Sequence, residues 1–246
     1  QQIEICGFQV KISNSNNIRE ILFTETSSRL LHGKKLIFGS SCGVAEMRGV
    51  RITQEDSVYI CARTSKGHSV YAVFDGHGGA TTSLYCTLVL KKVVNDPNFV
   101  FTEQYLREQI RNLQKQLEER HYSDGSTMAL AVVSDEENKI MIAHVGDARV
   151  LVTNDIGRLR FATPDHKPSS RSEFERIHAS GGRVTKGRVN SILAVARSLG
   201  DLHIAESLSA EPDITTYVIK TDDKWLYIAC DGVFDVLTNE EVGKIV

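Results

Sequence analysis

Apolar residues recur every three or four positions in the stretch TEQYLREQIRNLQKQLEERHY. Within it, Leu106, Ile110, Leu113 and Leu117 are spaced by 4, 3 and 4 residues. This spacing places one apolar stripe along a helix, with charged residues on the opposite face. The pattern therefore predicts an amphipathic helix that begins near Thr102 and turns its charged face to solvent.

Three further segments, residues 81–94, 170–182 and 238–246, are also predicted to be helical. The last two begin with SRSE and TNEE, where a Ser or Thr precedes a Glu by three residues. That spacing is typical of a capping box, in which the two side chains satisfy free backbone amides at a helix start.

Short apolar runs bounded by polar turns predict β-strands from about residue 35 onward. The runs cover residues 35–46, 57–63, 68–75, 126–135, 139–147, 149–155 and 224–232. The last of these reads as a buried strand, and the turn TSKG joins the second run to the third. Strands in hairpins with helices between them favour an α+β domain over a regular βαβ alternation. Residues 1–35 show no clear pattern and are expected to be a lead-in segment or the end of an upstream region.

The composition is that of an ordinary globular protein, with 41% hydrophobic and 24% charged residues among 246. A formal net charge of −2 gives no basic surplus, so a nucleic-acid partner is not expected. No apolar stretch has the length of a membrane span. The five cysteines, without CxxC spacing, indicate neither a zinc site nor a disulfide framework and favour a cytoplasmic, or at least intracellular, location: Cys6, Cys42, Cys61, Cys86 and Cys230.

Carboxylates stand where several predicted strands begin or end. YAVFDG and WLYIACDG each end an apolar run in an Asp followed by Gly, and IMIAHVGD ends in Gly-Asp. An acidic pair precedes another strand, and one more Asp lies a helical turn beyond ACDG. In chain order these residues are Glu55, Asp56, Asp75, Asp147, Asp231 and Asp235. Asp201, at the end of ILAVARSLGD, is less regular and is expected to orient its neighbours without holding a metal.

Carboxylates that converged without partners would repel one another and would be costly to desolvate. A divalent cation removes that cost, and a set of oxygen ligands favours Mg²⁺ or Mn²⁺ over zinc. The alternative is that these residues are turn and cap aspartates scattered over the surface. Spacing alone leaves both interpretations open.

The chain resembles the metal-dependent serine/threonine protein phosphatases of the type 2C family. The resemblance runs from about Phe38 to the end of the chain and rests on seven motifs in family order. They are MRGVRITQED, YAVFDGHGG, DGSTMALAVV, HVGDARVLV, TPDHKPSSRSEFERIHASGGRV, RVNSILAVARSLGD and ACDGVFDVLTNEE. On this basis residues 36–246 are expected to form the catalytic domain.

The resemblance implies a four-layer α-β-β-α sandwich, in which two antiparallel sheets lie between helices. It also implies two Mg²⁺ or Mn²⁺ ions in a cleft, bridged by Asp75 and completed by Asp231 and the Gly76 carbonyl. Glu55 and Asp56 would hold these ions directly or through water. Asp147 and Asp235 match positions that bind a third, weaker metal in some relatives.

Two more residues receive roles from the resemblance. Arg51 stands at the phosphate-binding position, where its planar fork suits two oxygens. His77 matches the residue expected to protonate the departing Ser or Thr oxygen, while metal-activated water attacks phosphorus without a phosphoenzyme. Residues 165–188 match the family's flap beside the cleft. The expected substrates are phosphoserine and phosphothreonine in proteins, with a role in signalling by dephosphorylation.

This sequence departs from the family at its end, where the closing Asp-Asn motif and final strands would follow Val246. We therefore expect a truncated domain that binds one metal weakly and turns over slowly, with an exposed sheet edge that favours a homodimer. The start at Gln1, without Met, suggests an excised piece. Two other functions stay open: a phosphatase-like interaction module with little or no catalysis, and another two-metal phosphoesterase.

Overall fold

The structure, a computed structural model, describes residues 2–5, 8–15, 18–25, 33–38, 42–61 and 63–245. Apart from the last two residues, the chain divides into two compact units, residues 1–54 and residues 55–244. Each unit is described by itself below.

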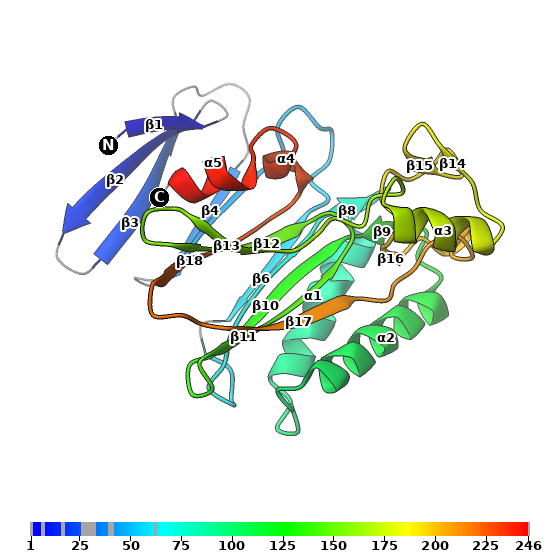
Figure 1. The fold of residues 1–246 in the computed structure, drawn as a ribbon, viewed down its shortest axis with the longest axis horizontal. Helices are drawn as coiled ribbons and strands as arrows, with labels where there is room; N and C mark the ends of the chain where they lie inside the picture. The colour runs from blue at the N-terminus through cyan, green and yellow to red at the C-terminus, as the bar shows by residue number, and fades with distance from the viewer. Residues whose placement is uncertain are drawn as a thin grey trace. The chain divides into compact units, whose positions relative to one another are not determined.

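The first unit contains two small antiparallel sheets (Figure 1). Strands β1 (Gln2–Ile5), β2 (Phe8–Ser15) and β3 (Ile18–Glu25) form a meander. Strands β4 (Gly33–Phe38) and β5 (Cys42–Met47) pair with each other. The run over residues 35–46, predicted as one strand, thus belongs to two paired strands, with residues 39–41 outside the described part of the chain.

The second unit is built around a five-stranded antiparallel sheet in the order β17-β11-β10-β7-β6. Its strands are β6 (Ser57–Cys61), β7 (Ser69–Phe74), β10 (Met128–Ser134), β11 (Lys139–Val145) and β17 (Asp213–Val218). Four of them confirm the predicted strands. The fifth, β17, was missed because it is an edge strand with the sequence DITTYV, whose half-exposed residues give no apolar run.

A second, three-stranded sheet has the order β13-β12-β18. It consists of β12 (Arg149–Asn154), β13 (Leu159–Ala162) and β18 (Asp223–Ala229). The prediction that β18 is a buried strand is wrong, because most of its side chains are only partly buried. Short strands pair elsewhere: β8 (Gly76–His77), β9 (Gly125–Ser126) and β16 (Leu199–Gly200) with one another, and β14 (Val184–Thr185) with β15 (Arg188–Val189).

The predicted helices are present as α1 (Thr81–Val94), α2 (Glu103–Arg120), α3 (Arg171–Ala179) and α5 (Asn239–Lys244), with a one-turn helix α4 (Asp231–Phe234). Thr102 caps α2 by accepting a hydrogen bond from the Tyr105 amide. The second predicted capping box forms, since Thr238 and Glu241 accept each other's backbone amides. Within the described residues, no helix is both long and apolar enough to cross a membrane.

The capping box predicted at the start of α3 does not form. Ser170 does lie at the helix start, but its side chain makes no capping hydrogen bond. The Glu173 carboxylate is instead bound by two guanidinium groups, those of Arg197 and Arg176. A charged partner attracts a carboxylate more strongly than a backbone amide does, so these ion pairs, one within α3 and one with Arg197, replace the cap.

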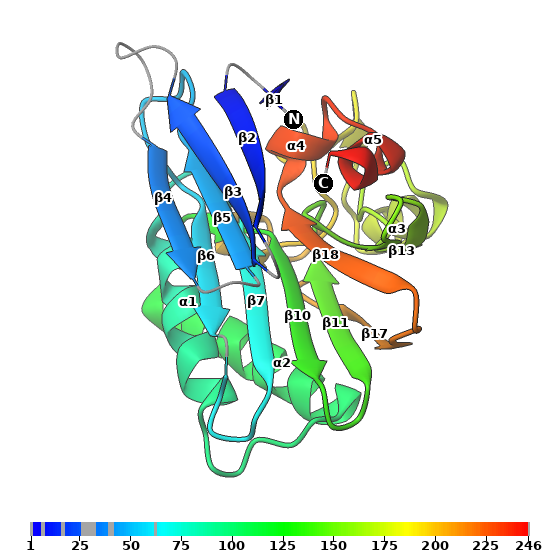
Figure 2. The same ribbon diagram turned by 90° about the vertical axis from the view of Figure 1, so that its left-hand side faces the viewer.

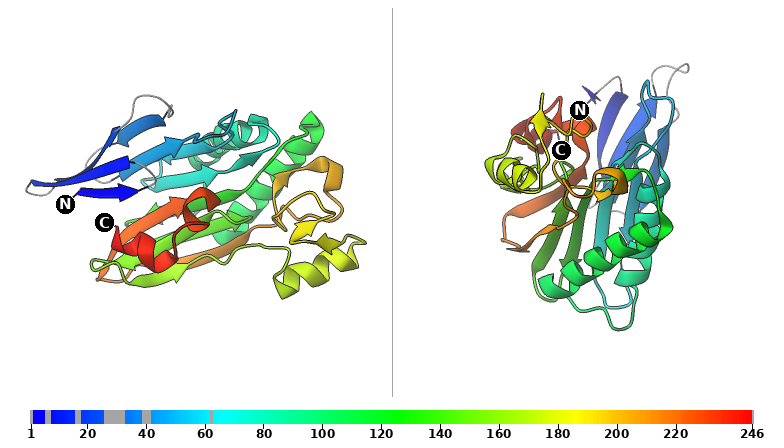
Figure 3. Two further views of the ribbon diagram at one scale, coloured as in Figure 1. Left: turned by 90° about the horizontal axis from the view of Figure 1, so that it is seen from above. Right: turned by 90° about the vertical axis from the view of Figure 1, so that its right-hand side faces the viewer.

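The apolar residues of the second unit form three successive layers of contact. One face of the five-stranded sheet packs against α1 and α2, and its other face packs against the second sheet through residues such as Ala131, Ile142 and Val150. The far face of the second sheet packs against α4 and α5 through Leu151 and Phe234. Figures 2 and 3 show α1 and α2 along one side of the five-stranded sheet. This is the predicted four-layer α-β-β-α sandwich.

Strand direction brings the ends of particular strands to one shared edge of the two sheets. Because neighbouring strands are antiparallel, β7 and β11 end at the edge where β6, β10 and β17 begin. In the second sheet, β18 ends where β12 begins, with Ala229 opposite Arg149. The turn 146–148 joins β11 to β12 and so connects the two sheets at this edge. The residues that follow β7, β11 and β18, and those that precede β6, therefore share it.

Candidate functional site

Four carboxylates meet at this edge of the sheets. Asp75 follows β7, Asp56 precedes β6, Asp147 lies in the turn between β11 and β12, and Asp231 follows β18. Burial, and then the charges of the other three, raise the pKa of Asp75 to about 8. Of the three neighbouring carboxylates, that of Asp56 has the largest effect on the pKa of Asp75. The structure thus gathers these four predicted residues into one strongly anionic site.

Cys230 completes the tightest part of this cluster. One ligand atom each from Asp56, Asp75 and Cys230 lies within 4.8 Å of the others. Burial, followed by the charges of Asp56 and Asp75, raises the pKa of the Cys230 thiol to about 12. The thiol therefore stays protonated near neutral pH, and the carboxylate oxygens are the charged donors of the cluster.

Gly76 lies against the segment that carries Glu55. A Cβ atom at Gly76 would stand 2.2 Å from the Glu55 carbonyl oxygen and 3.0 Å from the Ser83 hydroxyl. The same carbonyl accepts a hydrogen bond of 2.6 Å from Ser83, on α1. Only glycine fits this contact, which fixes the backbone before β6 against the backbone after β7.

Asp147 is nearly fully buried and has one cationic partner, since the Lys167 ammonium group donates a hydrogen bond to its carboxylate. Burial raises the pKa of Asp147, and the bond with Lys167 opposes that rise without cancelling it. Burial lowers the pKa of Lys167, but the charge of Asp147 outweighs it, so the pKa of Lys167 is raised. Both pKa values are raised, which shows that negative charge outweighs positive charge around this pair.

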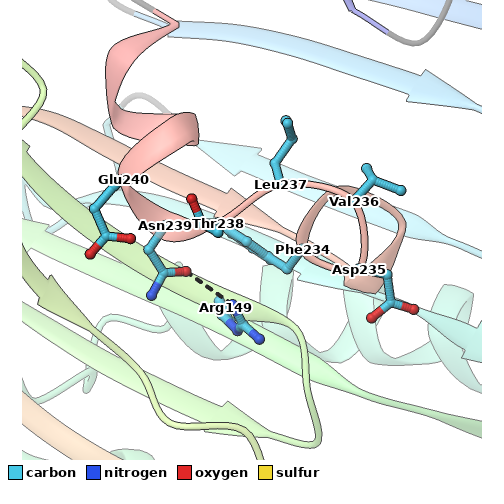
Figure 4. Close-up of a pocket in the computed structure, with 8 residues that line it drawn as sticks. All are labelled: Arg149, Phe234, Asp235, Val236, Leu237, Thr238, Asn239 and Glu240. Carbon is cyan, nitrogen blue, oxygen red and sulfur yellow. Dashed lines mark hydrogen bonds between the residues drawn. The ribbon is translucent and has the colours of Figure 1, made fainter.

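Asp235 lies apart from the tight cluster, at a cavity of about 410 Å³ beside the connection from α4 to α5. Figure 4 shows the lining residues Arg149, Phe234, Asp235, Val236, Leu237, Thr238, Asn239 and Glu240. The Arg149 guanidinium group lies 4.8 Å from the Phe234 ring centre and donates hydrogen bonds to Asp165 and Asn239. Asp235 is exposed and acts electrostatically on Arg149 and Lys167.

His77 stands on β8, next to the acidic cluster in sequence, and is held by Asp201. Its Nε2 atom lies 2.6 Å from an oxygen of the buried Asp201 carboxylate, which also accepts a hydrogen bond of 2.6 Å from Ser198. The His77 side chain keeps 27% of its surface exposed. Asp201 thus orients a neighbour, as the sequence predicted, and part of the imidazole stays exposed.

Asp124 is a buried carboxylate that the sequence did not single out. It accepts hydrogen bonds from the Thr81 and Thr82 amides and the Thr82 hydroxyl, which fixes the start of α1. Burial alone would raise the pKa of Asp124, but these bonds keep it below its usual value. Its sequence signal is the dipeptide Asp-Gly alone, without the preceding apolar run that marks Asp75.

The remaining predicted residues lie outside this cluster. Arg51 is exposed and belongs to the first unit, so its phosphate-binding role stays a prediction. Residues 165–188, the predicted flap, contain α3 and β14 and share a small apolar core around Ile177 and Val189. Lys167, His166 and Cys230 were missed as site residues, because their partners are 20 or more positions away in the sequence.

The donor set of the cluster suits Mg²⁺ or Mn²⁺. It consists of carboxylate oxygens; burial and then their mutual repulsion raise the pKa of Asp75, and a dication would relieve both effects. The protonated thiol adds no competing charge that would favour zinc. The residues present therefore fit a hard divalent cation.

Comparison with known proteins gives one family. Residues 40–246 match the family model described as Protein phosphatase 2C. The chain is 33% identical over 237 residues to a probable protein phosphatase 2C of Caenorhabditis elegans, covering 89% of this chain and 65% of that protein. It is 31% identical to protein phosphatase 2C homolog 3 of Schizosaccharomyces pombe, covering 83% of this chain but 53% of that protein. The chain thus spans only part of these relatives.

Solved structures show the same fold. A sex-determining protein of C. elegans superposes with a TM-score of 0.72 at 28% identity, covering 90% of this chain and 56% of that one. A serine-threonine phosphatase 2C from Toxoplasma gondii gives a TM-score of 0.69 at 21% identity, covering 89% of this chain and 84% of that one. At that identity the second likeness concerns the fold alone.

Proposed function

The chain belongs to the protein phosphatase 2C family, and from this premise we propose that it hydrolyses phosphoserine and phosphothreonine in proteins with the help of divalent cations. The observation that carries the proposal is the gathering of Asp56, Asp75 and Asp231 at one sheet edge, where burial and repulsion raise the pKa of Asp75 to about 8. Such a charge excess is what bound dications relieve.

We assign the cation ligands as follows. Asp75, Asp231 and the Gly76 carbonyl would hold two Mg²⁺ or Mn²⁺ ions, with Glu55 and Asp56 as direct or water-mediated ligands. Asp147 and Asp235 would hold a third ion more weakly. When bound, the cations lower the pKa of a water molecule and offset the charge of the phosphoryl group.

His77 supplies the proton that the leaving Ser or Thr oxygen needs. The contact between its Nε2 atom and Asp201, at 2.6 Å, fixes the ring plane. Its partly exposed side chain is accessible from solvent, as a proton donor to the leaving oxygen must be. Arg51 would bind two phosphoryl oxygens, an assignment supported by its motif MRGVRITQED alone.

The test is phosphate release from a phosphothreonine peptide, measured with Mn²⁺ and after chelation by EDTA. We expect release only with the cation, and a fall of at least about a hundredfold in kcat for Asp75→Ala. Asp135→Asn is the matched control, because Asp135 is an exposed carboxylate in the turn after β10, at the opposite end of the strands. Its activity should equal that of the unchanged protein.

Two results would contradict the proposal: no Mn²⁺-dependent release, or equal loss in Asp75→Ala and Asp135→Asn. Mn²⁺ binding without turnover would favour the interaction module instead. The expected homodimer remains a proposal as well, and light scattering that shows a monomer at high concentration would contradict it.

A further inference from the structure

Two buried histidines and an aspartate form a second cluster of titratable groups in the second unit. His144 is the last residue but one of β11, and Asp213 lies directly opposite it on β17. His166, in the segment after β13, stacks on His144 with ring centres 4.4 Å apart and an angle of 6° between the rings. Both histidines are only 3% exposed. The proposed reaction uses none of the three side chains.

This cluster is a poor metal site, although its ligand atoms lie within 4.8 Å of one another. An imidazole lone pair lies in the plane of its ring, and two nearly parallel stacked rings cannot both point their lone pairs at one ion. The ring nitrogens also form hydrogen bonds within the protein: His144 Nε2 with the Pro164 carbonyl at 2.8 Å, and His166 Nε2 with Asp213 at 3.2 Å. The geometry indicates hydrogen bonding as the role of this cluster.

His166 is bound to the turn that carries Asp147. The Gly146 amide donates a hydrogen bond of 3.1 Å to His166 Nδ1, and the His166 amide donates one of 2.9 Å to the Gly146 carbonyl. These two hydrogen bonds run in opposite directions and tie the two residues together at two points. Gly146 has a φ of +98°, and a Cβ atom there would lie 2.7 Å from Thr127, so its backbone is closely confined.

The bonds of His166 also determine where its proton lies. Because Nδ1 accepts from the Gly146 amide, the neutral ring carries its proton on Nε2, which then donates to Asp213. Asp213 is held in turn by Arg197 at 2.8 Å, and Arg197 binds Glu173 of α3. Burial, and then the charge of Arg197, lower the pKa of His166, in keeping with a neutral ring.

We propose that His166 is a positioning residue: its Nδ1 atom fixes the Gly146 amide, and thereby the turn that presents Asp147 to a cation. Asp213 holds the ring in the tautomer that this bond needs. The consequence for cation binding rests on the proposed function, whereas the bond itself does not. Loss of an outer partner of this kind lowers metal affinity by about 10–100-fold in metalloproteins.

Two substitutions separate the two hydrogen bonds of the ring. Asn places its side-chain oxygen near the position of Nδ1, so His166→Asn keeps an acceptor for Gly146 and loses the donor to Asp213. Gln places its amide nitrogen near the position of Nε2, so His166→Gln keeps the donor and loses the acceptor. A third variant, Glu173→Gln, weakens the ion pairs at the far end of the network and leaves both ring bonds in place.

The first readout is hydrogen exchange of the Gly146 amide in the metal-free protein. We expect the Gly146 amide to exchange at least about tenfold faster in His166→Gln than in His166→Asn. A tenfold faster exchange corresponds to a loss of about 1.4 kcal/mol in the free energy of opening. Glu173→Gln should show the unchanged rate at Gly146, even where its global stability falls. Nitrogen-15 NMR of the imidazole should show His166 protonated on Nε2.

The second readout is Mn²⁺ binding, followed by calorimetry. The weakest class of ions should bind about tenfold or more weakly to His166→Gln and within about threefold of the unchanged protein to His166→Asn. Equal exchange at Gly146 in the two variants, or a proton on Nδ1, would overturn the inference. A failure of the proposed function is distinguishable, because it would appear as absent phosphate release in the unchanged protein while the difference at Gly146 persists.

Discussion

At the scale of single residues, the site depends on positions where no side chain fits. Gly125 is the clearest case, because a Cβ atom there would stand 2.1 Å from an Asp201 carboxylate oxygen and 2.5 Å from His77 Nε2. Real Cβ contacts are not this short, so Asp201 and His77 would have to separate. Gly125, the glycine of DGST, therefore allows His77, the proposed proton donor, to keep its contact with Asp201.

We expect Gly125→Ala to lower kcat by about a hundredfold, as displacement of a reacting group by an ångström does. The control is Gly43→Ala on β5, where an added Cβ meets no atom within 4 Å. Steady-state kinetics on the phosphothreonine peptide would measure the effect. Equal kcat values for the two variants would show that the contact of His77 with Asp201 is not needed.

Lys167 leads to a second prediction, since it is the ammonium group bound to the Asp147 carboxylate. Lys167→Met removes a cation with which Mn²⁺ must compete. We expect the weakest class of Mn²⁺ to bind roughly tenfold tighter, because a hydrogen bond to a charged group contributes about 1.5 kcal/mol or more. Calorimetry would measure this, with Lys139→Met as control, since Lys139 pairs with the exposed Glu137 at the opposite sheet edge. Weaker binding would show that Lys167 assists the ion.

These residues also show what the sequence could reveal. Asp75 and Asp231 were predictable because an apolar run ending in Asp-Gly is visible within a few positions. The Lys167 partner of Asp147 and the His166 partner of Gly146 were not, because they come from a segment 20 residues away. Only the fold brings that segment back to the turn.

At the scale of elements, the spacing of apolar residues correctly predicted the helices and strands that local contacts determine. The stripe of α2 is buried as expected, with Leu106, Ile110, Leu113 and Leu117 all facing the sheet. The pattern failed where a neighbour far along the chain decides the structure. Glu173 binds Arg197 in place of capping α3, and β17 is defined by its pairing with β11 rather than by apolar residues.

The element β11 carries a pH-dependent prediction through His144. Burial, and then His166, lower the pKa of His144 from 6.5 to about 4. Between these values the unfolded chain binds a proton that the folded chain does not, so stability falls as the pH falls through this window. The contribution is on the order of 3 kcal/mol and is fully present above pH 6.5.

Denaturant unfolding at pH 4.5 and pH 7 would measure this effect. We expect His144→Asn to lose less stability between the two pH values than the unchanged protein does. His121→Asn is the matched control, because His121 is an exposed helix cap and Asn tolerates its positive φ. Parallel pH profiles for His144→Asn and the unchanged protein would contradict the prediction.

At the scale of the whole second unit, the site exists because strand order and direction collect distant chain segments. The sequence could predict carboxylates at strand ends but not which ends meet, since that follows from the pairing of β7, β10, β11 and β12 in two sheets. The resemblance to a known family supplied the fold that local patterns could not.

The raised pKa of Asp75 makes cation binding by the second unit depend on pH. The pKa of Asp75, about 8 in the folded metal-free protein, exceeds its ordinary value of 3.8, so below pH 8 a cation must displace a proton. We expect Mn²⁺ to raise Tm more at pH 8 than at pH 6, with apparent affinity rising by up to about tenfold per pH unit and levelling above pH 8. Calorimetric scans at fixed free Mn²⁺ would measure this, and Asp75→Asn should lack the rise. A Tm shift independent of pH would show that Asp75 binds no cation.

The same strand order places short connections at the opposite edge of the sheets. Residues 64–67, 135–138 and 155–158 lie between paired strands there, and residues 219–222 lead from β17 in the five-stranded sheet to β18 in the second sheet. A reporter peptide or a surface tether inserted at 135–138 would therefore leave the acidic cluster around Asp75 unobstructed. The edge with the acidic cluster would carry the chemistry, and the opposite edge would serve for attachment.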